Sequence, residues 1–256
     1  MVAVFRGQFG DLENEWGKVM ADGRGFLDGV LPGVTQIQSD GYKFIGIGAA
    51  ITLVGFFIWS TLGWIAGIAT VCVALFFRDP DRVAPLREGL VLAASDGLVL
   101  TIDKVKPPTE LLLDSAEVWR VATALSMSDV HVNRAPVAGR VLQSVYVPGA
   151  FLNPTLDKAS EDNERRAVLF EMSSGKKLSV VQIAGLITRR ILTFVHEGDS
   201  VGVGQRIGMI RFGSRVDVYL PEGATPLVSV GQRMVAGETV LADMKSEEPE
   251  REARRV

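Results

Sequence analysis

The sequence contains one cysteine and two histidines. Cys72 alone excludes an intrachain disulfide and a zinc site built from cysteines, because both need more than one thiol group. His131 and His196 leave little for a histidine-rich metal site, so no bound metal is expected. Catalysis in this chain would therefore depend on a few polar side chains, or on a cofactor that the chain makes or borrows.

The chain also lacks an excess of basic residues. It carries 27 Lys and Arg against 30 Asp and Glu, which gives a net charge of −3. Nucleic-acid binding needs clustered positive charge against phosphate, so this balance argues against that class of protein. At about 100–200 residues per domain, the length of 256 residues indicates one large domain or two small ones.

Charge is absent altogether between Phe44 and Phe77. One straight helix over this apolar segment would be about 51 Å long, against about 30 Å for the hydrocarbon core of a bilayer. Residues 60–64 (S-T-L-G-W) offer a break, which predicts a helical hairpin associated with the membrane. A pair of buried core helices in a soluble protein is the alternative, although soluble helices usually carry a polar face.

Basic residues flank this segment and predict its orientation. Lys43 precedes it, and Arg78, Arg82 and Arg87 follow it. The positive-inside tendency places the C-terminal bulk of the chain in the cytoplasm. We therefore expect attachment to the cytoplasmic face of the cell membrane, either by a hairpin that crosses the bilayer or by one that enters a single leaflet.

After Pro85, apolar residues alternate over short runs separated by turn-forming residues. This pattern predicts a mostly β (α+β) domain, with one helix near residues 108–117. Strands are expected at 90–94, 97–102, 137–147, 167–172, 178–183, 187–195 and 215–220. The predicted organisation is a polar segment (1–43), the membrane-associated hairpin (44–77), the β domain (78–244) and a disordered tail (245–256).

Two features of the β domain resemble biotinyl and lipoyl carrier domains. The run V-G-V-G-Q-R-I at 201–207 recurs as V-S-V-G-Q-R-M at 228–234, which is a weak internal repeat. The phrase E-G-D-S-V-G-V-G-Q-R-I-G at 197–208 is similar to the turn of those domains, and P-V-A-G-R-V at 136–141 is similar to a strand entry. The resemblance implies a barrel-like sandwich of short hairpins and says nothing about chemistry.

Gly213 and Ser214 lie between two strand-like runs. Glycine leaves its carbonyl open to attack, and the hydroxyl of the following serine can reach that carbonyl. Such an attack would turn the amide into an ester, and elimination across the serine would leave a pyruvoyl group at a new N-terminus. A glycine bulge followed by a surface serine is the commoner meaning of a bare Gly-Ser pair, so further motifs must support self-cleavage.

Five motifs in a fixed order supply that support. They are F-R-D-P (77–80), A-S-D-G (94–97), M-S-D-V-H-V-N-R-A-P (127–136), L-D-K-A-S-E-D-N-E-R (156–165) and R-F-G-S-R-V-D-V-Y-L-P (211–221). With these motifs the chain resembles the short bacterial form of the phosphatidylserine decarboxylase proenzyme family, over about residues 44–242.

The resemblance implies that the chain cuts itself between Gly213 and Ser214. The products would be a β chain (1–213) and an α chain (214–256), held together without a covalent bond. Ser214 would become the pyruvoyl cofactor, which forms a Schiff base with phosphatidylserine, releases CO2 and yields phosphatidylethanolamine. The implied partners are this lipid and the membrane.

A serine nucleophile needs a base, and the base needs a group that orients it. His131 is the predicted base, and Asp96 is the predicted orienting group. Related decarboxylases often carry two histidines three residues apart here, whereas this chain has Arg134 at the second position. If the second histidine is the cleavage base in those relatives, this chain must use His131 in both cleavage and decarboxylation, or use another base. Asp129 is expected to cap a turn, although it could also orient His131.

Other polar residues and two other functions complete the set of hypotheses. Arg134, Arg211 and Arg215 are candidates for the lipid phosphate without an assignment, and His196 is expected in a surface turn. The D-K-A run at 157–159 resembles a lipoylated hairpin, which would make Lys158 the modified residue of a carrier domain. A membrane-anchored serine hydrolase using Ser214, His131 and Asp96 is the third possibility, although no G-x-S-x-G elbow surrounds the serine.

Overall fold

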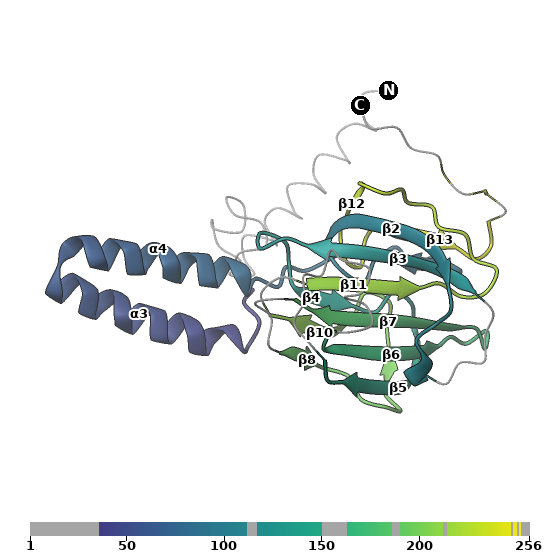
Figure 1. Ribbon diagram of the computed structural model, residues 1–256, viewed down its shortest axis with the longest axis horizontal. Helices are drawn as coiled ribbons and strands as arrows, with labels where there is room; N and C mark the ends of the chain where they lie inside the picture. The colour runs from purple at the N-terminus through teal and green to yellow at the C-terminus, as the bar shows by residue number, and fades with distance from the viewer. Residues whose placement is uncertain are drawn as a thin grey trace, which may run out of the picture. The chain divides into compact units, whose positions relative to one another are not determined.

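The computed structural model describes residues 36–111, 117–149, 163–185, 190–211 and 214–246, together with 248, 249 and 251 (Figure 1). The chain divides into two compact units, Met1–Asp81 and Arg82–Val256. Each unit is described by itself. The predicted domain boundaries at 43, 77 and 244 stay predictions.

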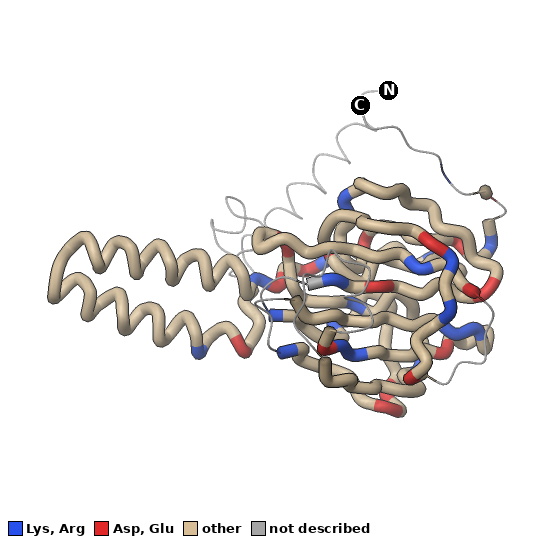
Figure 2. The backbone as a smooth tube through the Cα atoms, viewed as in Figure 1, with Lys and Arg blue, Asp and Glu red and all other residues tan. Residues whose placement is uncertain are grey.

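The first unit contains a helical hairpin. Helix α3 (Gly41–Ile58) and helix α4 (Ser60–Phe76) are joined at Trp59, whose extended backbone (φ −162°, ψ 127°) ends the first helix. The predicted hairpin is confirmed, and its break falls one residue before the expected segment 60–64. Figure 2 shows the two helices almost entirely without charge. By length and composition, α3 qualifies as a membrane-crossing helix among the described segments, and α4 is shorter, at 17 residues.

Small residues bring the two helices together. A Cβ atom on Gly55 would lie 3.1 Å from the backbone nitrogen of Gly63, and one on Gly48 would lie 2.6 Å from Thr70 Oγ1. The hydroxyls of Thr52 and Thr70 lie 3.3 Å apart and form a hydrogen bond between the helices. Close approach through glycine, with hydroxyl hydrogen bonds across the contact, is typical of helices that pack inside a membrane.

The second unit is built from β-strands, confirming the predicted mostly β class. Its large sheet has eight strands, and every pairing within it is antiparallel. The spatial order is β12 (Arg233–Met234), β2 (Gly97–Val105), β3 (Val118–Leu125), β11 (Ser214–Tyr219), β7 (Lys177–Ala184), β6 (Arg165–Glu171), β5 (Gly139–Val147) and β9 (Ser200–Val201). The sheet curls into a half-barrel (Figure 1).

Two smaller sheets complete the unit. One has the order β4 (Val132–Arg134), β10 (Arg206–Ile210) and β8 (Ile191–Thr193), and the other pairs β1 (Leu90–Leu92) with β13 (Val240–Asp243). The helix expected near residues 108–117 is described only as a single 3-10 turn, η1 (Thr109–Leu111), because residues 112–116 lie outside the described residues.

Apolar side chains bury both faces of the large sheet. On β11, Val216 and Val218 belong to the main core, whereas Tyr219 belongs to a second cluster together with Val181 and Ile183 of β7. Alternate residues of a strand point to opposite faces, which explains this division. Strand β11 is therefore a central strand that is covered on both sides.

The internal repeat forms the same turn twice. In the first copy the side chain of Gln205 accepts a hydrogen bond from the backbone of Gly202 (2.9 Å), and in the second copy Gln232 accepts one from Ser229 (3.1 Å). Gly204 has a φ of 72° and Gly231 a φ of 86°, a conformation that favours glycine. The first copy leads into β10 and the second into β12.

Candidate active site

Ser214 is the first residue of β11, at the centre of the large sheet. Its backbone pairs with Leu125 of β3 on one side and with Ala184 of β7 on the other. Gly213, the other residue of the predicted cleavage site, lies outside the described residues, and so does the side chain of Ser214. The strand pairing therefore fixes the backbone position of residue 214, from which the surrounding site can be built.

His131 is completely buried in the segment between β3 and β4. Its backbone carbonyl accepts a hydrogen bond from the backbone N–H of Ile210 (3.2 Å), at the end of β10. The loop that carries His131 therefore contacts the chain on both sides of the predicted cleavage site. Before the site, Ile210 is hydrogen-bonded to the loop. After the site, Ser214 pairs with Leu125, the residue at which β3 ends and the loop begins. This arrangement brings His131 to the same end of the domain as residue 214.

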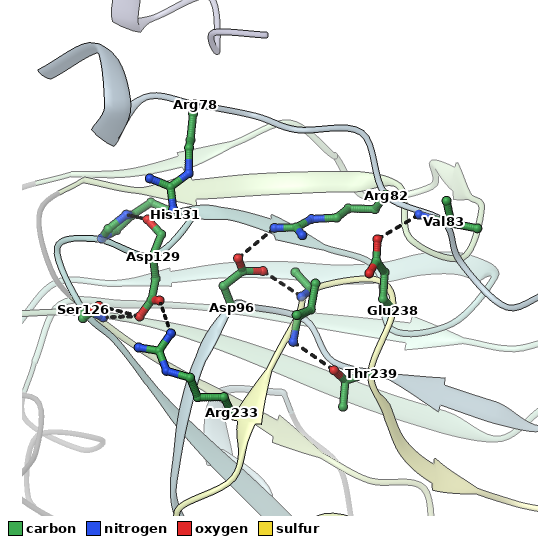
Figure 3. A network of polar contacts seen from close by, with 12 residues as sticks. Arg78, Arg82, Val83, Asp96, Ser126, Asp129, His131, Arg233, Glu238 and Thr239 are labelled. Carbon is green, nitrogen blue, oxygen red and sulfur yellow. Dashed lines mark hydrogen bonds and ion pairs between the residues drawn. The ribbon is translucent and has the colours of Figure 1, made fainter. Parts of the chain in front are cut away.

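The protonation of the His131 ring follows from its contact. Its Nδ1 lies 2.9 Å from the backbone carbonyl oxygen of Asp129 (Figure 3). A carbonyl oxygen can only accept a hydrogen bond, so Nδ1 carries the hydrogen. In the neutral imidazole Nε2 is then the basic nitrogen, which gives the ring the form that a general base requires.

Asp96 precedes β2 and is held by two donors. Its carboxylate accepts hydrogen bonds from Arg82 Nη2 and from the backbone N–H of Ala236, both at 2.8 Å (Figure 3). Burial raises the pKa of Asp96 above its usual value, because the Ala236 N–H and the Arg82 charge only partly offset desolvation and the nearby Asp129 charge adds to the rise. The site therefore contains a carboxyl group with a raised affinity for a proton.

The described contacts of His131 and Asp96 involve different partners. Nδ1 of His131 contacts the backbone carbonyl of Asp129, and the Asp96 carboxylate contacts Arg82 and Ala236. A role of Asp96 as the orienting group stays a prediction, and the described hydrogen bonds of Asp96 supply no direct link for it.

Asp129 does cap a turn. Its carboxylate accepts hydrogen bonds from the backbone N–H of Ser126 (2.8 Å) and the hydroxyl of Ser126 (2.7 Å), and it forms an ion pair with Arg233 at 3.1 Å. Burial alone would raise the pKa of Asp129, but these Ser126 and Arg233 contacts outweigh burial and lower it. Asp129 therefore fixes the turn with its carboxylate and His131 with its backbone carbonyl.

The structure gives contacts for two of the arginines considered for a lipid phosphate, Arg134 and Arg215. Arg134 is buried and donates to the backbone carbonyl of Gly204 (3.0 Å). Arg215 is 1% exposed and forms a bidentate ion pair with Asp217, in which Nε donates to Oδ1 (2.6 Å) and Nη2 donates to Oδ2 (3.1 Å). Arg211 is half-buried at the end of the described segment. The phosphate-binding residue stays unassigned.

The remaining predicted residues lie elsewhere or outside the described part. The side chain of His196 is 85% exposed, in the turn where its backbone N–H bonds Asp199, as expected of a surface turn. Lys158 falls outside the described residues. Within the described segments, no three His, Cys, Asp or Glu side chains gather as they would around a metal ion.

Sequence reasoning missed two pairs of residues at this site. Arg82 and Arg233 hold the two carboxylates, and nothing local in the sequence links them to Asp96 or Asp129. Asn133 and Gln182 form a buried hydrogen bond of 2.7 Å. Asn133 could have been noticed, because it follows His131 by two residues and strand alternation puts both on one side of the chain.

Comparison with known proteins identifies the family. The family model described as phosphatidylserine decarboxylase matches residues 70–242. The chain is similar to proteins named phosphatidylserine decarboxylase proenzyme from Ruegeria pomeroyi (53% identity over 82% of this chain and 95% of the relative) and Nitrobacter winogradskyi (53%, 83% and 86%). It is also similar to the protein of that name from Cereibacter sphaeroides (51%, 85% and 94%).

A mostly β domain that matches decarboxylase proenzymes over most of the chain defines a carboxy-lyase that is made as a proenzyme. The chain belongs to the phosphatidylserine decarboxylase family.

Proposed function

We propose that this chain cuts itself before Ser214, converts Ser214 into a pyruvoyl group and then decarboxylates phosphatidylserine to phosphatidylethanolamine and CO2. The observation that carries the proposal is the position of Ser214 at the start of central strand β11, beside the loop that carries the buried His131. Family membership supports the lipid substrate, since the matched relatives are named after its decarboxylation.

Self-cleavage uses groups of the chain itself and one water molecule. The Ser214 hydroxyl attacks the carbonyl carbon of Gly213, and Nε2 of His131 takes the hydroxyl proton. The C–N bond then breaks, the nitrogen of residue 214 receives that proton, and an ester remains. Loss of the α-proton breaks the ester C–O bond and leaves a carboxylate on residue 213. Water then replaces nitrogen at residue 214, releasing ammonia and completing the pyruvoyl group.

The surroundings of residue 214 are compatible with a pyruvoyl group that forms from Ser214 itself. Its backbone is held between β3 and β7, so the position stays anchored after the preceding bond is cut. When formed, the pyruvoyl carbonyl takes up the substrate amine and accepts the electrons released with CO2. Residue His131, buried at the same end of the domain, is the group proposed to return a proton afterwards.

The strand order supports a heterodimer of the two products. Residues 214–256 would contribute β11, which pairs with β3 and β7, and also β12 and β13, which pair with β2 and β1. Two further contacts cross the cut: Arg233 to Asp129, and the backbone of Ala236 to Asp96. The α chain would thus remain attached through strand pairing and would help to hold the carboxylates of the site.

We place the enzyme at the membrane through the hairpin of α3 and α4. Its large side chains face outward, including Phe57 (93% exposed), Ile58 (72%) and Leu53 (66%). Eighteen helical residues are about 27 Å long, close to the ~30 Å hydrocarbon core. An apolar surface of this kind belongs in lipid, where the substrate is also found. The flanking Lys43 and Arg78 favour the cytoplasmic side.

Ser214→Ala tests the proposal directly, because alanine has no hydroxyl to attack the preceding carbonyl. We expect one uncut chain without decarboxylase activity, measured by denaturing gel, intact mass and release of CO2. Ser179→Ala is the matched control, because Ser179 is a buried serine of the neighbouring strand β7. The Ser179→Ala chain should cut itself normally. Cleavage and activity in Ser214→Ala would refute the proposal.

A further inference from the structure

Asn133 is a buried polar residue of β4 to which the proposed reaction gives no role so far. It is completely buried, and its Oδ1 accepts a hydrogen bond of 2.7 Å from Gln182 Nε2. Its Nδ2 is also buried and has no hydrogen-bond acceptor among the described residues. A buried donor without an acceptor is destabilising and uncommon, which indicates that this N–H group serves a partner formed during function.

The position of Asn133 relates it to His131. The two residues are separated by one position, so alternation along the extended chain puts them on one side, about 7 Å apart. On the other side of the contact, Gln182 of β7 pairs with Val216 of β11. The pair of Ala184 and Ser214 lies two residues further along the same two strands. Gln182, which holds Asn133, therefore lies two register positions, about 7 Å along the strands, from the pair that contains Ser214.

The backbone of β10 is adapted to the Gln182 amide. A Cβ atom at Gly208 would lie 2.8 Å from Gln182 Nε2 and 2.5 Å from the carbonyl oxygen of Leu192. Glycine at 208 thus leaves the space in which the Gln182 amide lies. Since that amide fixes Oδ1 of Asn133, it also fixes the direction of the unpartnered Nδ2 group.

We infer that Asn133 Nδ2 donates a hydrogen bond to the oxyanion that forms on the Gly213 carbonyl when Ser214 attacks it. The inference rests on the proposed self-cleavage. In that step the new C–O bond pushes an electron pair onto the carbonyl oxygen, and the amide N–H stabilises the negative charge until the C–N bond breaks. A buried donor held in a fixed direction is suited to this task, because it need not reorganise as the charge develops.

Asn133→Asp is the sharpest test, because aspartate keeps the shape and the acceptor for Gln182 but removes the amide donor. Cleavage of newly translated chain is followed by pulse labelling and denaturing gel. We expect it to be about 100- to 1000-fold slower than in the wild type. A double variant, Asn133→Leu with Gln182→Leu, removes both polar groups together and is expected to cleave as slowly. Thermal unfolding in the Ser214→Ala background establishes that each variant folds.

Hydroxylamine distinguishes formation of the ester from the later cleavage of the ester. It cuts esters, so it should release the α chain wherever the ester has formed, and the sequence has no Asn-Gly bond for it to attack. We expect Asn133→Asp to stay slow in hydroxylamine, because the donor acts before the ester exists. Cleavage of either variant at the wild-type rate, or rapid cleavage of Asn133→Asp in hydroxylamine, would overturn the inference.

The failure of this inference is distinct from a failure of the proposed function. If Ser214→Ala stays uncut while Asn133→Asp cleaves normally, only the role of Asn133 is lost. If wild-type chain is active but never cut, the self-cleavage itself is lost. Ser179→Ala again serves as the control, since its hydroxyl is buried on β7 without an acceptor among the described residues.

Discussion

The backbone carbonyl of Asp129 contacts the ring of His131, whereas an acid–base triad uses a carboxylate at that position. The Asp129 carbonyl fixes the ring through Nδ1 without adding a negative charge beside it. Asp96, whose pKa is raised by burial, keeps its carboxylate on Arg82 and Ala236. The Ser126–Asp129 turn therefore holds the carbonyl group that Nδ1 of His131 contacts.

The role of His131 can be tested by His131→Ala. Without the basic nitrogen, the Ser214 hydroxyl keeps its proton, so we expect self-cleavage to be blocked or greatly slowed. The measurement is the amount of α chain formed over time, with and without added imidazole, which should restore part of the rate. His196→Ala is the control, because His196 is a surface residue. Normal maturation of His131→Ala would move the base to another residue.

At the scale of elements, the turn from Ser126 to Asp129 links the end of β3 to His131. The Asp129 carboxylate accepts hydrogen bonds from both the backbone and the hydroxyl of Ser126, and Arg233 approaches from the start of β12. The ion pair contributes little by itself, since the Arg233 side chain is 68% exposed. The buried hydrogen bonds to the charged carboxylate are the stronger part of the turn.

This turn gives a pH-dependent stability with a definite sign. The pKa of Asp129 is lower in the folded chain than its ordinary value of 3.8, so the charged form stabilises the fold above that value. The stabilisation is lost as the pH falls through the lower pKa of the folded state. We expect Asp129→Asn to reduce the free energy of unfolding by about 1–2 kcal/mol at pH 7.

Urea unfolding of the uncut Ser214→Ala chain, with and without Asp129→Asn, measures this difference. The difference should shrink steadily below about pH 4, where Asp129 of the unfolded chain takes up a proton before the folded chain does. A difference that is equally large at pH 7 and pH 3 would mean that the charge of Asp129 is not what stabilises the turn.

At the scale of the whole molecule, the chain divides into an apolar helical unit and a β unit. The hairpin has its own packing through Gly55, Gly63 and the threonine pair, so it does not need the β unit to hold its helices together. The β unit has its own core of buried aliphatic residues. Attachment to lipid and chemistry are therefore expected to be separable.

Deletion of residues 1–77 is expected to abolish sedimentation with vesicles that contain phosphatidylserine, while cleavage before Ser214 continues. The full chain should stay bound at high salt, because apolar insertion is not screened as surface charge is. Vesicle pelleting at low and high salt, with denaturing gels of both fractions, provides the measurement. A truncated chain that still pellets would place the membrane contact in the β unit.

The sequence by itself determined the features that depend on neighbouring residues. The absence of charge from Phe44 to Phe77 specified the hairpin, since only lipid or a protein core accepts such a surface. Alternation of apolar residues specified β2, β5, β6, β7 and β11 to within a few residues. The repeated V-x-V-G-Q-R run specified the same turn twice, because its glycine and glutamine act within four residues.

Only the tertiary structure decided which distant groups meet. Strand register brought Gln182 to Asn133 and Ser214 between Leu125 and Ala184, and the turn after β12 brought Ala236 to Asp96. These contacts depend on how strands far apart in sequence line up, and local preferences for turn and strand carry no information about that alignment.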